Sequence, residues 1–403
     1  MSTKTPPSSS SLLRVAISRP FMGKEEAEAA CQAIRSGWVG QGPRVAEFEA
    51  RLASLLGAPH AVVLSSGTAA LHLALLAMGI GPGDEVLVPA SSFIATANAV
   101  LMTGARPVFA DVNPRTANLD VSDASLRVTP RTRALLVVHQ LGLPADLHAC
   151  RELCNRHGLR LVEDAACALG SRYGSEPIGR PHGLAACFSF HPRKVITTGE
   201  GGAVTTADAI VAERIRHLRN HGAEPTGLPP HRGGAIRYPI LGYNARMSDL
   251  EAAVGLEQLD RLQWLLGKRA ALAARYDSRL RGHSALDLPS LNPPGVTPSW
   301  QSYQVLLTPE CPLSADAVAI ALAEAGVDSR PGLTALHLEP LYLETNRGLC
   351  LPGAEQIAAN GLMLPLHPGL SDSDVDLVCH ILLDIFEAGR SGALGAHLDS
   401  RAP

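Results

Sequence analysis

The stretch VVLSSGTAALHLALLAMGIGPGDEVLV, residues Val62–Val88, contains the repeating unit from which the fold can be predicted. It begins and ends with short apolar runs, Val62–Leu64 and Val86–Val88, and Thr68–Met78 between them has the length and apolar period of a helix. Short continuous apolar runs are typical of strands that helices cover on both faces. The stretch therefore predicts two parallel strands joined by a right-handed helical crossover.

The same alternation continues along the chain. Apolar runs at Val108–Phe109, Leu135–Val138 and Leu161–Val162 alternate with helical patterns at Ile94–Thr103 and Leu147–His157. This order predicts an α/β fold, with a mostly parallel mixed sheet flanked by helices. Such sheets bind ligands outside the carboxyl ends of their strands, so we expect the chemistry there.

The last third of the chain predicts a smaller α+β domain. A long helix is expected over Ser248–Leu266, continuing in helical pattern to about Arg281, and the Pro-rich segment Leu286–Pro298 predicts a loop. After it we expect a strand at Ser302–Leu307, a helix at Ala315–Ala325, a loop at Leu364–Leu370 and a helix at Ser373–Ala388. The expected division is a flexible tail at 1–11, a large domain at 12–266, a small domain at 267–390 and a second tail at 391–403.

Composition argues against several classes of function. A formal charge of −3, from 35 basic and 38 acidic side chains, gives no basic footprint for nucleic acid or an anionic membrane. No apolar run approaches the roughly 18–20 residues that span a bilayer, and the N-terminus lacks the apolar core of a signal peptide. We therefore expect a cytoplasmic protein with neither a nucleic-acid nor a membrane partner.

The eight cysteines are scattered and form no CxxC pair. Cys150 and Cys154 lie one helical turn apart, a spacing that could bind a metal, but two thiols on one helix face more often pack in a core. We expect reduced thiols and no metal.

The first candidate site is Ser65–Thr68, directly after a strand and before a helix. The unpaired N–H groups at a helix N-terminus bind phosphate well. Gly67 permits a close backbone approach, and Thr68 adds a hydroxyl. The alternative is an ordinary N-cap.

The second candidate is a strand that ends in two carboxylates, Glu163 and Asp164. An acid at this position could bind a ribose, magnesium or a cation, or could simply be solvated. In enzymes that use pyridoxal phosphate (PLP), an aspartate keeps the pyridine nitrogen protonated.

The third candidate is Lys194, in the stretch FSFHPRKVITTGEGG that begins at Phe188. A lysine among apolar and glycine residues loses its proton readily and can form a Schiff base. Ser189 lies five residues earlier and could reach the same phosphate. A surface lysine is the alternative, but the surrounding residues are not typical of a surface. The three sites in this order predict a PLP enzyme.

With these motifs the chain resembles the DegT/DnrJ/EryC1/StrS family of PLP-dependent aminotransferases, which act mainly on sugars. The resemblance covers about residues 15–386. It rests on SSGTAALHLALLAMGIGPGDEV (Ser65–Val86), FIATANAV (Phe93–Val100), GLPADL (Gly142–Leu147), EDAACALGS (Glu163–Ser171), SFHPRKVITTGEGG (Ser189–Gly202), GYNARMSDLEAAVGLEQL (Gly242–Leu259) and LMLPLHPGLSDSDVD (Leu362–Asp376).

The resemblance implies the fold of fold-type I PLP enzymes and a role for each matching residue. Lys194 would bind the cofactor as a Schiff base and then move protons, while Asp164 would pair with the pyridine nitrogen. Asn244 would reach the neighbouring subunit's cofactor phosphate, which implies a homodimer with shared active sites. The other implied contacts are Gly67, Thr68 and Ser189 with the phosphate and Phe93 stacked on the ring.

Substrates are implied less specifically. The resemblance points to L-glutamate as amino donor and a nucleotide-activated ketodeoxysugar as acceptor. Trp38 matches a segment at the active-site entrance, and Arg330 and His337 match a loop near the sugar nucleotide, although either could instead stabilise that loop. Cys167 stands where Gln or His is common beside the ring, and it offers a weaker hydrogen bond.

Three alternatives stay open at this point. The acceptor could be a non-sugar ketone, as in relatives that aminate cyclitols or make aminohydroxybenzoate. The enzyme could be a PLP lyase acting by elimination, although the C-terminal resemblance opposes this. A non-catalytic regulatory protein is disfavoured because the chemistry-bearing residues are all present. The family's dehydratase branch has His where this chain has Lys194, which favours transamination.

Overall fold

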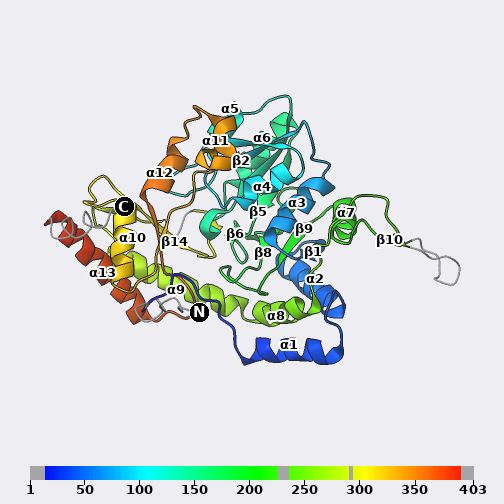
Figure 1. The fold of residues 1–403 in the computed structure, drawn as a ribbon, viewed down its shortest axis with the longest axis horizontal. Helices are drawn as coiled ribbons and strands as arrows, with labels where there is room; N and C mark the ends of the chain where they lie inside the picture. The colour runs from blue at the N-terminus through cyan, green and yellow to red at the C-terminus, as the bar shows by residue number, and fades with distance from the viewer. Residues whose placement is uncertain (1–13, 226–235, 290–293, 392–403) are drawn as a thin grey trace, which may run out of the picture.

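The computed structural model describes residues 14–225, 236–289 and 294–391. The tail expected at 1–11 and all but the first residue of the tail expected at 391–403 lie outside the described residues. A seven-stranded sheet lies at the centre of the larger part, in the order β1-β9-β8-β5-β4-β2-β3 (Figure 1). Its strands are β1 (His60–Leu64), β2 (Glu85–Pro89), β3 (Arg106–Ala110), β4 (Thr132–Val138), β5 (Arg160–Asp164), β8 (Ala185–Ser189) and β9 (Gly202–Thr206).

The sheet is mixed and mostly parallel, as predicted. β9 runs antiparallel to both of its neighbours, β1 and β8, and the remaining neighbours in the sheet pair in parallel. Each of the five apolar runs lies within one of the strands β1 to β5. The predicted crossover helices are α3 (Gly67–Ala77), α4 (Ala95–Met102) and α6 (Leu147–His157).

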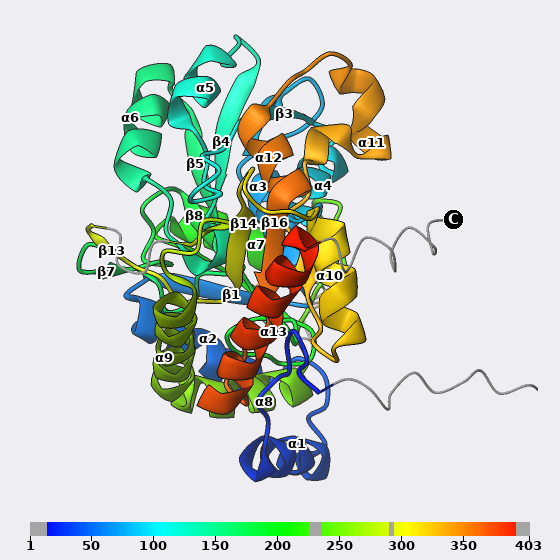
Figure 2. The same cartoon turned by 90° about the vertical axis from the view of Figure 1, so that its left-hand side faces the viewer.

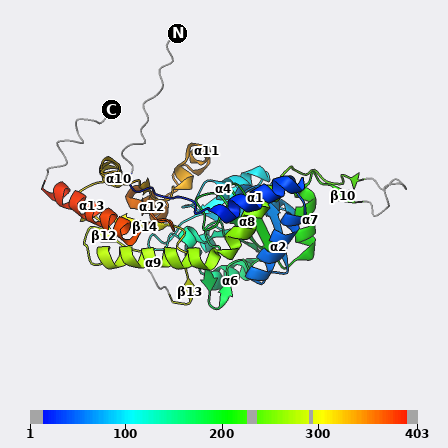
Figure 3. The same cartoon turned by 90° about the horizontal axis from the view of Figure 1, so that it is seen from below.

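Helices cover both faces of this sheet. Alternate strand residues point to opposite sides and therefore pack against different helices. Val62 and Leu64 pack with α3, α4 and α7 (Ala209–Arg219) in one core. Val63, between them, packs with α2 (Pro43–Leu56), α6 and α8 (Asp249–Asp260) in another. Outside this layer, α1 (Lys24–Ser36) lies along α8 (Figure 3).

The single helix expected from Ser248 to about Arg281 is two helices, α8 and α9 (Leu262–Leu280). Arg261, between them, forms an ion pair with Glu26 of α1 at 3.0 Å. The break lets α8 pack in the large sheet's core while α9 packs beside α13 (Asp372–Arg390). The domain boundary expected at residues 266 and 267 lies inside α9.

A smaller antiparallel sheet follows, in the order β12-β14-β16-β15. With α9, α10 and α13 it encloses a separate hydrophobic core, and Figure 2 views the molecule from the side that these helices cover. The segment Leu286–Pro298, expected as a loop, carries the two-residue strands β12 and β13 near its ends. The bounds are β12 (Leu286–Asp287), β13 (Val296–Thr297), β14 (Tyr303–Leu307), β15 (Arg330–Pro331), β16 (Gly361–Leu364) and α10 (Ala315–Glu324).

The remaining elements are short or peripheral. β6 pairs with β13 on one side and with β7 on the other, and β10 pairs with β11. Within the described ranges, no helix combines the length and the apolarity that a membrane crossing requires. These elements are β6 (Arg172–Tyr173), β7 (Glu176–Pro177), β10 (Glu224–Pro225), β11 (Ile236–Arg237), α5 (Val121–Leu126), α11 (Pro340–Leu343) and α12 (Pro352–Asn360).

Candidate active site

A cavity of about 320 Å³ lies between the carboxyl edge of the large sheet and the small sheet. The large sheet contributes the ends of β4, β5 and β8 and the start of α3, which is where ligands bind in parallel sheets. The small sheet contributes Arg330 and Met363. The volume falls in the range of small-molecule pockets.

Most of the site residues expected from the sequence line this one cavity, although they come from segments far apart in the chain. They are Gly67, Thr68, Phe93, Asp164, Cys167, Ser189, Lys194 and Arg330.

The start of α3 forms an anion-binding corner. Ser66 caps the helix, because its Oγ accepts from the N–H of Ala69 at 3.1 Å and its carbonyl accepts from Ala70. The N–H groups of Gly67 and Thr68 have no partner within the helix and border the cavity. A Cβ on Gly67 would lie 2.7 Å from the Cβ of Ser189, so the two segments meet this closely only because residue 67 is glycine. The corner fits a phosphate.

Asp164 is almost completely buried, with 4% of its surface exposed. Its Oδ2 accepts from Thr96 Oγ1 at 2.8 Å and its Oδ1 from the N–H of Ala166 at 3.1 Å. Burial raises the pKa of Asp164, and these two hydrogen bonds, with the positive charge of Lys194, offset only part of that effect. A buried carboxylate of this kind gains from a cationic partner, so it fits a protonated pyridine nitrogen.

His139 and Glu163 form a buried pair next to Asp164. The N–H of His139 donates to the Asp164 carbonyl at 3.1 Å, and His139 Nε2 lies 3.1 Å from Glu163 Oε2. Because His139 Nδ1 accepts from the N–H of Ala145, the ring proton lies on Nε2 and is donated to Glu163. Both strand-end acids are buried, so the solvated-acid alternative is wrong.

Lys194 lies on the loop between β8 and β9, and its Nζ donates to Cys167 Sγ at 3.3 Å. The loop turns back tightly, because the N–H of Lys194 donates to the carbonyl of His191 and the N–H of Thr198 to that of Phe190. The side chain therefore points into the cavity and is not a free surface lysine.

Three expected site residues do not line the cavity of this single chain. Trp38 is 57% exposed between α1 and α2, and Asn244 is exposed beside Asn220, with which it forms a β-bridge. His337 is completely buried, and its Nε2 lies 3.2 Å from Glu355 Oε1. The geometry of His337 is that of a loop-stabilising residue.

The sequence interpretation missed several polar side chains in the cavity. Thr96 lies in the motif FIATANAV, and its place in the first turn of the helix that follows a strand could have indicated it. Gln301 gives no such signal, because it reaches the cavity only when the small sheet packs on the large one. Others are Ser92, Gln140, His191 and Arg193.

Comparison with known families shows to which family the chain belongs. The model of the DegT/DnrJ/EryC1/StrS aminotransferase family matches residues 20–383. The chain belongs to this family. It is a PLP-dependent aminotransferase, and PLP is the cofactor that the anion-binding corner and the buried carboxylate fit.

Solved structures agree with the fold of this aminotransferase. The aminotransferase TlmJ from Streptoalloteichus hindustanus is 37% identical, with a TM-score of 0.86 over 93% of this chain and 99% of that one. DesV from S. venezuelae, solved with a ketimine intermediate, is 38% identical, with a TM-score of 0.81 over 89% and 93%. Spr1654 from Streptococcus pneumoniae, whose name gives it as a sugar aminotransferase, was solved in a PLP form. It is 29% identical, with a TM-score of 0.85 over 93% and 98%.

Proposed function

We propose that this aminotransferase moves an amino group from L-glutamate to a keto group of a nucleotide-activated ketodeoxysugar. The observation that carries the proposal is the meeting of an anion-binding corner, a buried carboxylate and Lys194 in one cavity. The name of Spr1654 as a sugar aminotransferase supports a sugar acceptor.

The proposed role of each residue follows from its position in the cavity. The N–H groups of Gly67 and Thr68, with the hydroxyl of Ser189, hold the cofactor phosphate. Asp164 holds the proton on the pyridine nitrogen, which lets bound PLP act as an electron sink. Phe93, 72% exposed at the cavity rim, covers one face of the ring.

Lys194 has two tasks in this proposal. It would first hold the cofactor through its Nζ. As a free amine, Lys194 would then move a proton between the substrate carbon and the C4′ carbon beside the ring, in one direction for the amino donor and in the other for the keto acceptor. Cys167, 3.3 Å from Nζ, is the neighbour that receives the hydrogen bond of the free amine.

The cavity also carries positive charge for the substrates. The side chains of Arg193 and Arg330 both line it, and neither forms an ion pair with a carboxylate among the described residues. Guanidinium groups suit carboxylates and phosphates. L-glutamate and a sugar nucleotide both bring such anions, so we assign Arg330 to substrate binding.

We further propose a cytoplasmic homodimer in which Asn244 reaches the partner's cofactor phosphate and Trp38 lies at the shared entrance. Both side chains are exposed on this chain, so both are accessible to a partner subunit. All eight cysteines are free thiols, which suits a reducing compartment. The proposed division is a large domain at 12–266 and a small one at 267–390, with α9 spanning the boundary.

The visible absorption spectrum with and without L-glutamate tests the donor. A Schiff-base band that bleaches with glutamate, and returns when a nucleotide-linked ketosugar is added, supports the full proposal. A band that returns only with a keto-cyclitol identifies a non-sugar acceptor. Pyruvate and ammonia released from cysteine or cystathionine would instead show a lyase.

A further inference from the structure

The segment Ser299–Ser302, just before β14, connects the small sheet to the lysine loop and to the other loops around the active site; we call it the 299–302 strap. Ser299 Oγ donates to the carbonyl of Cys167 at 2.9 Å, and the N–H of Ser299 to that of Gly142 at 3.1 Å. Gln301 Nε2 donates to the carbonyl of Arg193 at 2.8 Å. Four consecutive residues thus contact three separate loops of the large sheet.

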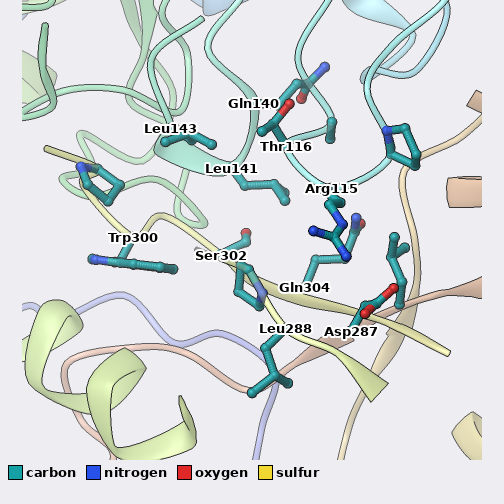
Figure 4. A pocket seen from close by; sticks show the side chains of 15 residues that line it. Arg115, Thr116, Gln140, Leu141, Leu143, Asp287, Leu288, Trp300, Ser302 and Gln304 are labelled. Atoms are coloured by element: carbon teal, nitrogen blue, oxygen red, sulfur yellow. The ribbon is translucent and has the colours of Figure 1, made fainter. Parts of the chain in front are cut away.

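The backbone of the strap is strained. Trp300 has a φ of 53°, in the left-handed region that a bulky residue rarely adopts. Leu141, with a φ of 58°, accepts a backbone hydrogen bond from Ser302, and Figure 4 shows Trp300 and Ser302 next to Leu141 at a small pocket beside the main cavity. Strain of this kind persists only where the surroundings impose it, and it concentrates at functional sites.

Arg269 of α9 imposes this conformation. Its Nη1 lies within hydrogen-bond distance of the carbonyls of Trp300, Gln301 and Leu366, at 3.3, 3.1 and 3.1 Å. Arg269 is 2% exposed, and no acid among the described residues pairs with it. Burying a guanidinium without a carboxylate is costly, so its contacts with the strap have to compensate for that cost.

We propose that the 299–302 strap positions Lys194, with Gln301 as the residue that acts on the lysine loop and Arg269 as the residue that fixes the strap. The proposal rests on the proposed function in one respect, namely that Lys194 is the lysine that binds PLP.

The effect of Gln301 follows from the peptide group that it contacts. The Arg193 carbonyl and the Lys194 N–H belong to the same planar peptide. Gln301 binds its carbonyl at 2.8 Å, and the carbonyl of His191 accepts its N–H at 2.8 Å. With both ends bonded, rotation of the peptide is restrained, and this restrains the direction in which the Lys194 side chain leaves the backbone. Ser302 Oγ donates to Gln301 Oε1 at 3.0 Å, which turns the amide's N–H toward Arg193.

The test measures how fast apoenzyme and added PLP form the Schiff base, followed by the visible band after rapid mixing. Gln301→Met keeps the length of the side chain and removes the donor. We expect Schiff-base formation at least about tenfold slower, because a misplacement of about 1 Å can cost up to about 100-fold. Equilibrium binding of pyridoxamine phosphate, which forms no Schiff base with the lysine, should stay unchanged when it is measured by fluorescence, because Gln301 contacts neither the phosphate corner nor Asp164.

Thr308→Val is the matched control. It removes a bond of the same kind, from Thr308 Oγ1 to the carbonyl of Ser284 at the other end of β14, and should form the band at the wild-type rate. Ser302→Ala is a second variant that leaves Gln301 in place but frees its amide, and it should slow the reaction to a smaller extent.

The outcomes separate the two proposals. If Lys194→Ala still forms the band, the assignment of the lysine is wrong. If Lys194→Ala forms none and both Gln301→Met and Ser302→Ala react at the wild-type rate, the positioning role of the strap is overturned. Equal slowing by Thr308→Val would overturn it too, since any loss of small-sheet stability would then suffice.

Discussion

Replacing Thr96 by valine removes the hydroxyl that donates to Asp164 and leaves the size of the side chain nearly unchanged. The bond is 2.8 Å long, and its acceptor is a carboxylate with 4% of its surface exposed. A hydrogen bond to a charged group contributes about 1.5–3 kcal/mol. Burial already raises the pKa of Asp164, so losing this bond disfavours the charged carboxylate further. We therefore expect the PLP dissociation constant to rise roughly 10- to 100-fold.

The assay is a titration of apoenzyme with PLP, read at the visible band at neutral pH. Thr103→Val is the control, because it is the same substitution at the end of the same helix, where Thr103 Oγ1 donates to the carbonyl of Val100 at 2.8 Å. It should lower thermal stability and leave PLP affinity unchanged. Equal PLP affinity in Thr96→Val and wild type, or equal losses in both variants, would refute the role given to Thr96.

Two further predictions concern stability and assembly. Arg275 and Arg279 of α9 hold the pKa of Asp376 of α13 at about 2. These two ion pairs therefore stabilise the fold above about pH 4, and their contribution is lost as the pH falls through about 2. Asp376→Asn should therefore lower the thermal midpoint at pH 7, and the difference from wild type should shrink toward pH 2; a constant difference would contradict this. Mixed dimers of Lys194→Ala and Asn244→Ala subunits should recover activity that neither parent has, because one of their two sites is intact in both residues. Verified mixed dimers without activity would exclude Asn244 from acting in the partner's site.

The central sheet could be predicted because its signal is local. Strands β1 to β5 are short apolar runs, and burial by helices on both faces requires that pattern. β9 carries no such signal, since the sequence GAVTT includes two threonines that are buried by bonding to carbonyls of other segments. The break at Arg261 was also missed, because no Gly or Pro marks it in the sequence.

The residues of the candidate site also differ in whether their signal is local in the sequence. Lys194 and Asp164 were predicted because each occurs in a local context that suits its chemistry. Thr96 and Gln301 were missed because their partners lie 68 and 108 residues away, and only the pairing of strands and the packing of the two sheets bring them together. His337 was predicted from its loop, but burial beside Glu355 gives it a structural position.

The most direct test of the account is to find the residue that carries the cofactor. Borohydride reduction fixes a Schiff base as a stable secondary amine, and peptide mass mapping of the reduced holoenzyme then locates the pyridoxyl group. We expect the group on Lys194, and no group on this residue when glutamate is added before reduction. A pyridoxyl group on any other lysine, or none on a protein that shows the visible band, would contradict the account.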